Sequence, residues 1–449
     1  MKRMTFTAAA ALLALAAFQG RAAADSTPGD GTGTGAPGLW QPSGAALTGA
    51  DTTADAPAMK PAESYRDTIG PGETKFYGIA LDAKESAYAS AFAVPPSGSR
   101  VAYGDGIELK LLSADGSNCD SADAHFQDDG NARPIGTAVA RTMGVGSSCQ
   151  DANQYTLQVH RNSAGTSDPG GWPLELRYVL EPALEPGTAA EPAPAFGTAS
   201  PTPLTTGTPR QARGGTDFTT AAAVRTGIWK DGVLPGETRF YKVPVDWGQQ
   251  ATVFADFSSA KVNDASTYVG SGVRLTAYSP VRQLIDGVGH SYQGTPTSLN
   301  ERIVPVSYVN RAASDSKVER VRYAGWYYFA VTVHPDVAQA VQGAVPVTLR
   351  VEVAGAAQAP PAYDGDPGTA GIGVDAHDVS SANGTATGGG SSSSGPLRFL
   401  AFAALGAGTV LVLSLGVWTL GARRRAAAAR ASAGDSVPPT GFGGPPPAW

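Results

Sequence analysis

Residues able to carry out chemistry are few and scattered along this chain. Its five histidines and two cysteines show no spacing typical of a metal site, such as Cys-x-x-Cys or His-Glu-x-x-His. The Gly-x-Ser-x-Gly nucleophile elbow and the phosphate-binding loop are also missing from the sequence. We therefore predict a non-enzymatic protein without a cofactor. A hydrolase whose residues converge only on folding is the alternative.

The two cysteines, Cys119 and Cys149, are predicted to form a disulfide. Both lie in the part of the chain that the N-terminal signal described below directs out of the cell, where thiols oxidise. The bridge would close the loop from residue 119 to residue 149. By restricting the unfolded chain it would stabilise the fold by about 3 to 4 kcal/mol.

Oxygen ligands gather close to these cysteines, at Asp128, Asp129 and Asn131 around a glycine. Carboxylate and amide oxygens on a glycine-containing turn are the ligands that Ca²⁺ prefers. The regular Asp-x-Asp-x-Asp-Gly spacing of a calcium loop is missing, so solvated turn residues are the competing interpretation. The metal content is left unknown.

Aromatic side chains gather in the second half of the chain, among them Trp229, Trp247 and Trp326. Exposed rings on a β-sheet can stack on sugars, so these three tryptophans are candidate binding residues. Alternation along a strand directs about half of such side chains into the core, and packing is therefore the competing interpretation.

The fold that positions the cysteines, carboxylates and tryptophans is indicated by two stretches of sequence that match one another. The segment 69–77, Ile-Gly-Pro-Gly-Glu-Thr-Lys-Phe-Tyr, corresponds to 233–241, Val-Leu-Pro-Gly-Glu-Thr-Arg-Phe-Tyr, and two further matches follow in the same order. The matched pieces alternate with period two and are rich in β-branched and aromatic residues, which indicates strands. The sequence predicts an all-β fold with two tandem antiparallel β-sandwich, jelly-roll-like domains, at residues 62–182 and 218–354.

Low-complexity segments flank the two modules. Residues 25–61 hold few large apolar side chains and are expected to be disordered. Residues 183–217 are expected to form a Pro/Ala/Thr-rich linker, and residues 355–396 a Gly/Ser-rich stalk.

Both ends of the chain carry targeting features. Residues 1–24 combine a basic start, an apolar run and a small-residue cleavage site, which is typical of a cleaved signal peptide. The uncharged run 399–421 would be about 34 Å long as a helix, enough to cross a hydrocarbon core of about 30 Å. We assign a C-terminal transmembrane helix to residues 397–421.

Basic residues after this run set its orientation. Arg423, Arg424 and Arg425 act as a stop-transfer signal and place the tail, residues 422–449, in the cytoplasm. The prediction is a single-pass type I protein of the plasma membrane with an extracellular N-terminus. Ala404 and Gly408 are spaced as in helices that approach closely, which would allow a weak homodimer.

The charge distribution limits the classes of partner. The formal net charge is −6 although both ends are basic, so the exported region is acidic and nucleic acid is excluded as a partner.

One stretch carries a resemblance to a known family. Residues 235–249, Pro-Gly-Glu-Thr-Arg-Phe-Tyr-Lys-Val-Pro-Val-Asp-Trp-Gly-Gln, resemble the opening strands of pre-peptidase C-terminal β-sandwiches, as found in actinobacterial membrane-anchored surface proteins. Some of those proteins carry a von Willebrand factor type A domain, whose Asp-x-Ser-x-Ser motif is missing here. The resemblance covers both modules and implies a non-catalytic part that binds or spaces, without defining site residues.

These features together predict a cell-surface interaction or scaffold protein. Its partner is expected to be an envelope or surface protein. The alternatives are a protein that binds cell-envelope polysaccharide, and a hydrolase with an unrecognised site.

Overall fold

The computed structural model describes residues 37–127, 130, 132–146, 149–188, 195, 200–264 and 267–385. In this part of the chain the strands form four sheets and the helices are short, so the fold is all-β, as predicted. None of the helices in the described ranges has both the length and the hydrophobicity needed to cross a bilayer. The predicted signal peptide, transmembrane helix and cytoplasmic tail lie outside these ranges.

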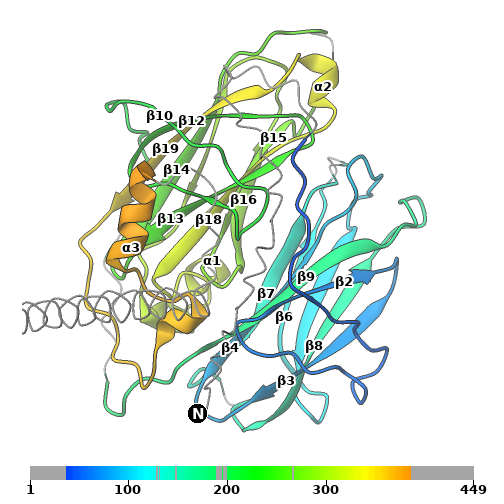
Figure 1. Cartoon of the computed structure of the whole chain (residues 1–449), viewed down its shortest axis with the longest axis vertical. Coiled ribbons are helices and arrows are strands. Elements are labelled where there is room, and N and C mark those ends of the chain that lie inside the picture. The colour runs from blue at the N-terminus through cyan, green and yellow to red at the C-terminus, as the bar shows by residue number, and fades with distance from the viewer. Residues whose placement is uncertain are drawn as a thin grey trace, which may run out of the picture. The chain divides into compact units, whose positions relative to one another are not determined.

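Two sheets form the N-terminal pair, drawn mainly in blue and cyan (Figure 1). The order in sheet A is β1 (Ala45–Ala46), β2 (Ser64–Ile69), β9 (Trp172–Glu181), β4 (Ser86–Ala93) and β7 (Ile135–Arg141). The order in sheet B is β3 (Thr74–Leu81), β8 (Asn153–Asn162), β5 (Gly106–Leu112) and β6 (Asn118–His125). Apolar side chains from the facing sides of the two sheets, such as Ile79, Leu109 and Leu176, form one core.

Two further sheets form the C-terminal pair, drawn mainly in green and yellow (Figure 1). The order in sheet C is β11 (Ala222–Ala223), β13 (Thr238–Val245), β18 (Gly325–Val333), β15 (Val273–Tyr278) and β16 (Leu284–His290). The order in sheet D is β10 (Arg210–Gln211), β12 (Gly227–Val233), β19 (Val345–Ala354), β14 (Gln250–Phe257) and β17 (Thr297–Arg302). Val243, Leu275 and Leu349 belong to the core between them.

The strand order is the same in the two pairs. The order β2-β9-β4-β7 in sheet A corresponds to β12-β19-β14-β17 in sheet D, and β3-β8-β5-β6 in sheet B corresponds to β13-β18-β15-β16 in sheet C. Neighbouring strands are antiparallel, apart from the short strands β1, β10 and β11, which pair in parallel. This arrangement is consistent with β-sandwich domains.

The same hydrogen-bonded latch joins the two sheets of each pair. Asp67 on β2 accepts a hydrogen bond of 2.8 Å from the Tyr77 hydroxyl on β3, and Asp231 on β12 accepts one of 2.6 Å from Tyr241 on β13. Each carboxylate also accepts a main-chain N–H from the segment that precedes its sandwich. The glutamate of each Pro-Gly-Glu-Thr copy accepts a main-chain N–H of its own turn. The repeated motif therefore has a structural role in both copies.

The disulfide between Cys119 and Cys149 is confirmed, with the two Cα atoms 5.8 Å apart. Cys119 lies on the edge strand β6 and Cys149 in the connection between β7 and β8. The bridge therefore fixes a long connection of the N-terminal pair to a sheet edge.

Short helices lie in the connections of the C-terminal pair and in the segment after its last strand. They are η1 (Tyr308–Ala312), α1 (Ser316–Glu319), α2 (Val337–Ala340), η2 (Pro367–Ala370), α3 (Ala376–Ser380) and η3 (Ser381–Thr385).

Parts of the predicted disordered segment, linker and stalk are packed, which corrects those predictions for residues 37–61, 200–217 and 355–385. Trp40 and Met59 are buried in the first of these ranges, and β1 pairs with β2. In the second, β10 pairs with β12, and in the third, Ile372 is buried. The physical reason is that main-chain hydrogen bonds to edge strands, together with a few large apolar anchors, order a segment whose overall composition is polar.

Candidate functional site

The outer face of sheet A packs against sheet C instead of facing solvent. All eight residues of β4 are buried, with alanines toward the core of the N-terminal pair and with Tyr88 and Phe92 toward sheet C. On β9 the same outer face carries Glu175, Arg177 and Glu181, while the alternate side chains enter the core. The two pairs therefore share a continuous buried surface, which we call the A–C interface.

Glu175 is the centre of one half of the A–C interface. Its Oε1 lies 2.8 Å from Nη1 of Arg282, in the turn between β15 and β16. Its Oε2 accepts hydrogen bonds from the main-chain N–H of Ser43, at 2.9 Å, and from Nε1 of Trp40, at 3.3 Å. Arg282 has a φ of 66°, a left-handed conformation that is uncommon for a residue with a side chain. The turn thus holds an unfavourable backbone conformation at the residue that pairs with the buried carboxylate.

A second arginine lies close to this pair. Burial, and secondly the positive charge of Arg282, lower the pKa of Arg177 to about 10. Two arginines and one carboxylate therefore share the same buried region, and removal of Glu175 would leave both cations without its charge.

Glu181 is the centre of the other half of the interface. This buried carboxylate pairs with Nη2 of Arg311 at 2.8 Å and accepts a hydrogen bond of 2.8 Å from the Tyr363 hydroxyl. The Tyr88 hydroxyl also donates to it. Burial, and secondly the charge of Glu181, raise the pKa of Tyr88, so that this hydroxyl stays protonated and able to donate.

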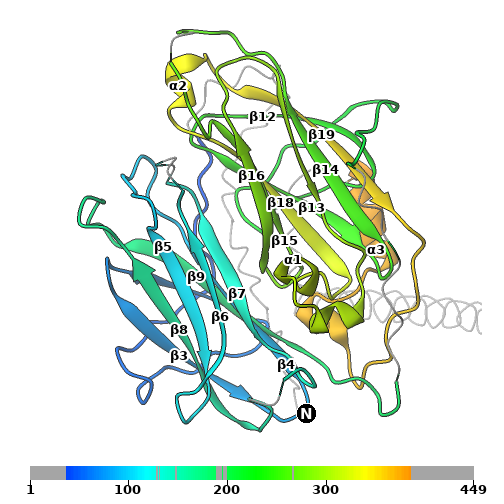
Figure 2. The ribbon, with the colours of Figure 1, turned by 180° about the vertical axis from the view of Figure 1, so that it is seen from behind.

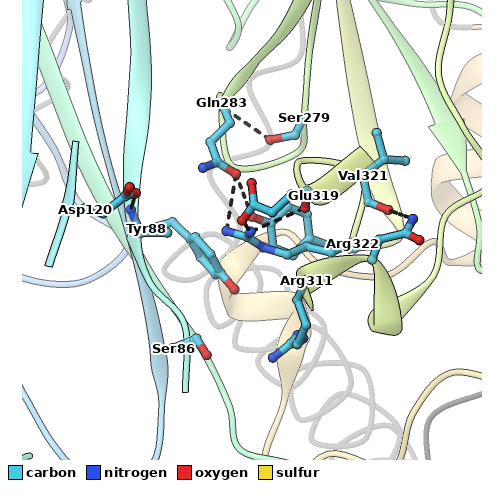
Figure 3. A network of polar contacts seen from close by, with 12 residues as sticks. Ser86, Tyr88, Asp120, Ser279, Gln283, Arg311, Glu319, Val321 and Arg322 are labelled. Carbon is cyan, nitrogen blue, oxygen red and sulfur yellow. Dashed lines mark hydrogen bonds and ion pairs between the residues drawn. The ribbon is translucent and has the colours of Figure 1, made fainter. Parts of the chain in front are cut away.

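Arg322 lies beside this network and is fully buried (Figure 3). Its guanidinium carbon is 5.1 Å from the ring centroids of both Tyr88 and Tyr323, which come from opposite sides of the interface. Arg322 forms an ion pair with Glu319, and its Nη2 lies 3.5 Å from Oε1 of Gln283. Buried cations are stabilised by such contacts with carboxylates, amides and aromatic faces.

The N-terminal segment, residues 37–43, connects the two pairs, and we call it the N-terminal strap. The ring of Trp40 is buried, and its centroid lies 5.4 Å from that of Phe92, 5.5 Å from Phe218 and 5.6 Å from Phe240. Phe92 belongs to sheet A, whereas Phe240 belongs to sheet C. The strap therefore contributes an aromatic wedge to the A–C interface.

A groove of about 470 Å³ lies beside the strap. Leu39 of the strap is 42% exposed, and Arg66 on β2 is exposed. Prolines at positions 95, 96 and 134 give part of the lining a restricted backbone. The C-terminal pair contributes Thr216, Gly236 and Thr238. Because both pairs line the groove, its shape depends on the A–C interface.

Trp229 and Trp247 lie in the core of the C-terminal pair, which corrects the prediction that they present rings to a sugar. Nε1 of Trp229 donates a hydrogen bond of 2.8 Å to the carbonyl of Arg225. These rings are buried because their strand positions face the opposite sheet.

Trp326 is half-buried on β18 and is already in contact on two sides. Its Nε1 donates a hydrogen bond of 3.0 Å to Asp378 on α3, and Nζ of Lys242 lies 4.7 Å from the ring centroid. The structure does not bring it together with Trp229, which belongs to the other sheet of the pair.

The remaining predicted site residues are outside the described ranges. These are Asp128, Asp129 and Asn131 near the cysteines, and the arginines 423–425. In the part of the chain that the structure describes, no three side chains of His, Cys, Asp or Glu are grouped so that they could hold a metal ion.

A hydroxyl and an imidazole meet on sheet B. Oγ1 of Thr74 and Nδ1 of His160 are 2.8 Å apart on the solvent side of β3 and β8. Such a pair resembles the start of a nucleophilic site. Acyl transfer also needs donors for the developing oxyanion and exclusion of water, and an open sheet face supplies little of either.

Sequence reasoning missed the interface residues on β4 and β9. A signal is nevertheless visible in β4, where Tyr88 and Phe92 alternate with alanines. The larger apolar side chains thus lie on the face turned away from the strand's own core, which indicates a second packed surface.

Comparisons with known proteins leave the family open, because no family model matches the chain and no curated protein sequence matches it. Among solved structures, the pre-peptidase C-terminal domain of a collagenase from Bacillus anthracis is 16% identical, and the match covers 28% of this chain and 94% of that domain with a TM-score of 0.18. The M60 catalytic domain with two CBM51 domains of Clostridium perfringens ZmpB is 10% identical over 64% of this chain and 34% of that one, with a TM-score of 0.17. The ANX1 ectodomain from Arabidopsis thaliana is 8% identical over 62% and 80%, with a TM-score of 0.18. Scores this low carry no argument about function.

Proposed function

We propose that this chain is a non-enzymatic interaction or scaffold protein, held at the cell surface by one C-terminal transmembrane helix. In this proposal residues 62–182 and 218–354 are tandem β-sandwich, jelly-roll-like modules of the pre-peptidase C-terminal type, as in actinobacterial surface proteins. The repeated strand order and the repeated Asp–Tyr latch support two copies of one module. The partner is another envelope or surface protein.

The A–C interface is the observation that carries this proposal. Glu175 and Glu181 are both buried, and each pairs with an arginine from the other sheet pair. Buried ion pairs contribute little net stability, but loss of one partner is costly, so they favour one arrangement over others. A plain spacer gains nothing from a fixed arrangement of two modules, whereas a binding surface built from both modules requires it.

The groove beside the N-terminal strap is the contact site in this proposal. Leu39 offers exposed apolar area, and Arg66 offers a cation at the same groove. A protein segment with an apolar side chain next to a carboxylate matches this pair of groups. Restricted proline backbones in the lining would lower the entropy lost on binding.

Site-specific photo-crosslinking in intact cells tests this proposal. A photo-reactive phenylalanine analogue is placed at position 39, and at position 262 as a matched control, since Leu39 is 42% and Val262 is 43% exposed. We expect one defined crosslinked protein from position 39 and none from position 262. Thr68→Trp, which fills the groove from β2, is expected to abolish the product.

Two results would refute the proposal. One is the same set of products from both positions, and the other is capture that persists in a folded Thr68→Trp variant. Of the alternatives, polysaccharide binding through the three predicted tryptophans is disfavoured, because two of them, Trp229 and Trp247, are buried in the core. The hydrolase role would have to rely on contacts such as the open Thr74–His160 pair.

A further inference from the structure

A tyrosine on the N-terminal pair is unusually exposed although its backbone is firmly held. Tyr103 is 68% exposed, in the turn that leads into β5. Asp105, which is 1% exposed, accepts hydrogen bonds from the main-chain N–H of Ala102 at 3.0 Å and of Ala164 at 2.7 Å. Ser167 donates a further one of 2.5 Å through its hydroxyl. A buried carboxylate thus orders the turn that presents an aromatic ring to solvent.

A hollow of about 440 Å³ lies next to this ring. It opens on the outer face of sheet B, whose strands β3, β8, β5 and β6 lie side by side (Figure 2). Gly106 on β5 lies beside the Tyr103 turn, and a Cβ there would lie 2.1 Å from the carbonyl oxygen of Ala124. Position 106 therefore requires glycine, because the main chain of β6 leaves no room for a side chain at this end of β5.

Polar side chains line the hollow on β5, β6 and β8. Glu108 is directly opposite Asp123 in the β5–β6 register, and both side chains are on the outer face. Nδ1 of His125 lies 2.8 Å from Oδ2 of Asp123. Asn162, at the end of β8, is exposed and lies opposite the start of β5. The hollow therefore combines one aromatic face with two carboxylates, an imidazole and an amide.

We propose that this hollow binds a neutral polysaccharide. The Tyr103 ring would stack on the C–H face of a sugar ring, since aromatic rings combine an apolar face with a polar edge. Glu108 and Asp123 would accept hydrogen bonds from sugar hydroxyls, and the Asn162 amide would both donate and accept. Glu108 is already paired with Nζ of Lys110 at 2.8 Å, and Asp123 is in contact with His125, so the charges at the hollow are paired within the protein. This pairing favours an uncharged ligand over a phosphate- or uronate-containing polymer. This site goes beyond the proposed function, because it shares no residue with the groove beside the strap.

Retention of the full chain, in mild detergent, on immobilised polysaccharide tests the site. The probes are cross-linked dextran, mannan and galactan beads, with polygalacturonate beads as the anionic comparison. We expect retention on at least one neutral polymer and a loss of about tenfold in affinity for Tyr103→Ala. Tyr103→Trp should retain binding, and Asp123→Asn should weaken it severalfold. Tyr268→Ala is the matched control, because Tyr268 is 73% exposed on the C-terminal pair and should leave binding unchanged.

Several outcomes would overturn the proposal. These are no retention on any neutral polymer, retention on polygalacturonate alone, or equal losses for Tyr103→Ala and Tyr268→Ala. An unchanged thermal transition shows that each variant is folded. Crosslinking from position 39 is measured in the same variants. Loss of polysaccharide retention with unchanged crosslinking concerns the hollow, whereas loss of crosslinking with unchanged retention concerns the groove.

Discussion

At the residue scale, Glu301 shows how burial makes stability depend on pH. This side chain lies at the end of β17, on the side that also buries Leu299. Burial, and secondly the charge of Asp286, raise the pKa of Glu301 from 4.5 to about 8. Because the pKa in the folded state is the higher one, the stabilisation is complete below about pH 4.5 and is lost as the pH rises through about 8.

We predict that Glu301→Gln becomes more stable relative to the wild type as the pH is raised from 5 to 8. The relative change should reach a few kcal/mol, since each unit of pKa shift corresponds to about 1.4 kcal/mol. Urea denaturation at each pH measures the free energy of unfolding. Glu185→Gln is the control, because Glu185 is exposed and its substitution should change the free energy of unfolding by no more than about 0.5 kcal/mol. A pH-independent difference for Glu301→Gln would contradict the assignment.

Individual residues also show where sequence reasoning succeeds and where it stops. The cysteine pair was predictable because a chain with two cysteines has one possible intramolecular bridge. The latches at Asp67 and Asp231 could also have been predicted from the sequence, because each aspartate precedes its copy of the matched segment, 69–77 or 233–241, by two residues. The burial of Trp229 was not, because residue type alone does not tell which face of a strand enters the core.

At the element scale, alternation identifies a strand but does not tell what covers each of its faces. On β9, Glu175, Arg177 and Glu181 alternate with apolar side chains, a pattern typical of a strand with one face in solvent. The structure buries that polar face against sheet C. Alternation of side chains with period two identifies a strand and its two faces. What packs against each face depends on residues far away in the sequence, which a local pattern does not contain.

The N-terminal strap is the element whose removal should be most informative. Trp40 fills an aromatic cluster shared by both sheet pairs, so Trp40→Ala should leave a cavity in the A–C interface. We expect a loss of about 3 to 5 kcal/mol in the free energy of unfolding. Amide hydrogen exchange should also become faster in β4 and β13, which carry the neighbouring rings.

A neighbouring substitution provides the comparison for the strap. Leu39→Ala changes an exposed side chain of the same segment and should alter stability by only about 0.5 kcal/mol. Equal effects of Trp40→Ala and Leu39→Ala, or unchanged exchange in β4 and β13, would show that the strap does not hold the interface together.

At the scale of the whole molecule, the central consequence is that the two sheet pairs should behave as one unit. Glu175 and Arg282 come from different pairs and are both buried, so loss of either residue leaves the other without its ion-pair partner. We predict a single cooperative unfolding transition for the wild type, detected at the same urea concentration by probes in each pair. Glu175→Leu and Arg282→Leu should each cost about 3 to 5 kcal/mol and should separate the two transitions.

A double-mutant cycle distinguishes docking through this ion pair from general damage to the two sandwiches. The combined Glu175→Leu/Arg282→Leu variant should lose clearly less stability than the sum of the single losses, by more than about 1 kcal/mol, because it leaves no buried charge unpaired between these two residues. The exposed pair Lys60–Glu63, 3.9 Å apart, is the control cycle and should show a coupling below about 0.5 kcal/mol. Additive losses at Glu175 and Arg282, or two separate transitions already in the wild type, would mean that the modules fold independently and that the groove they jointly line has no fixed shape.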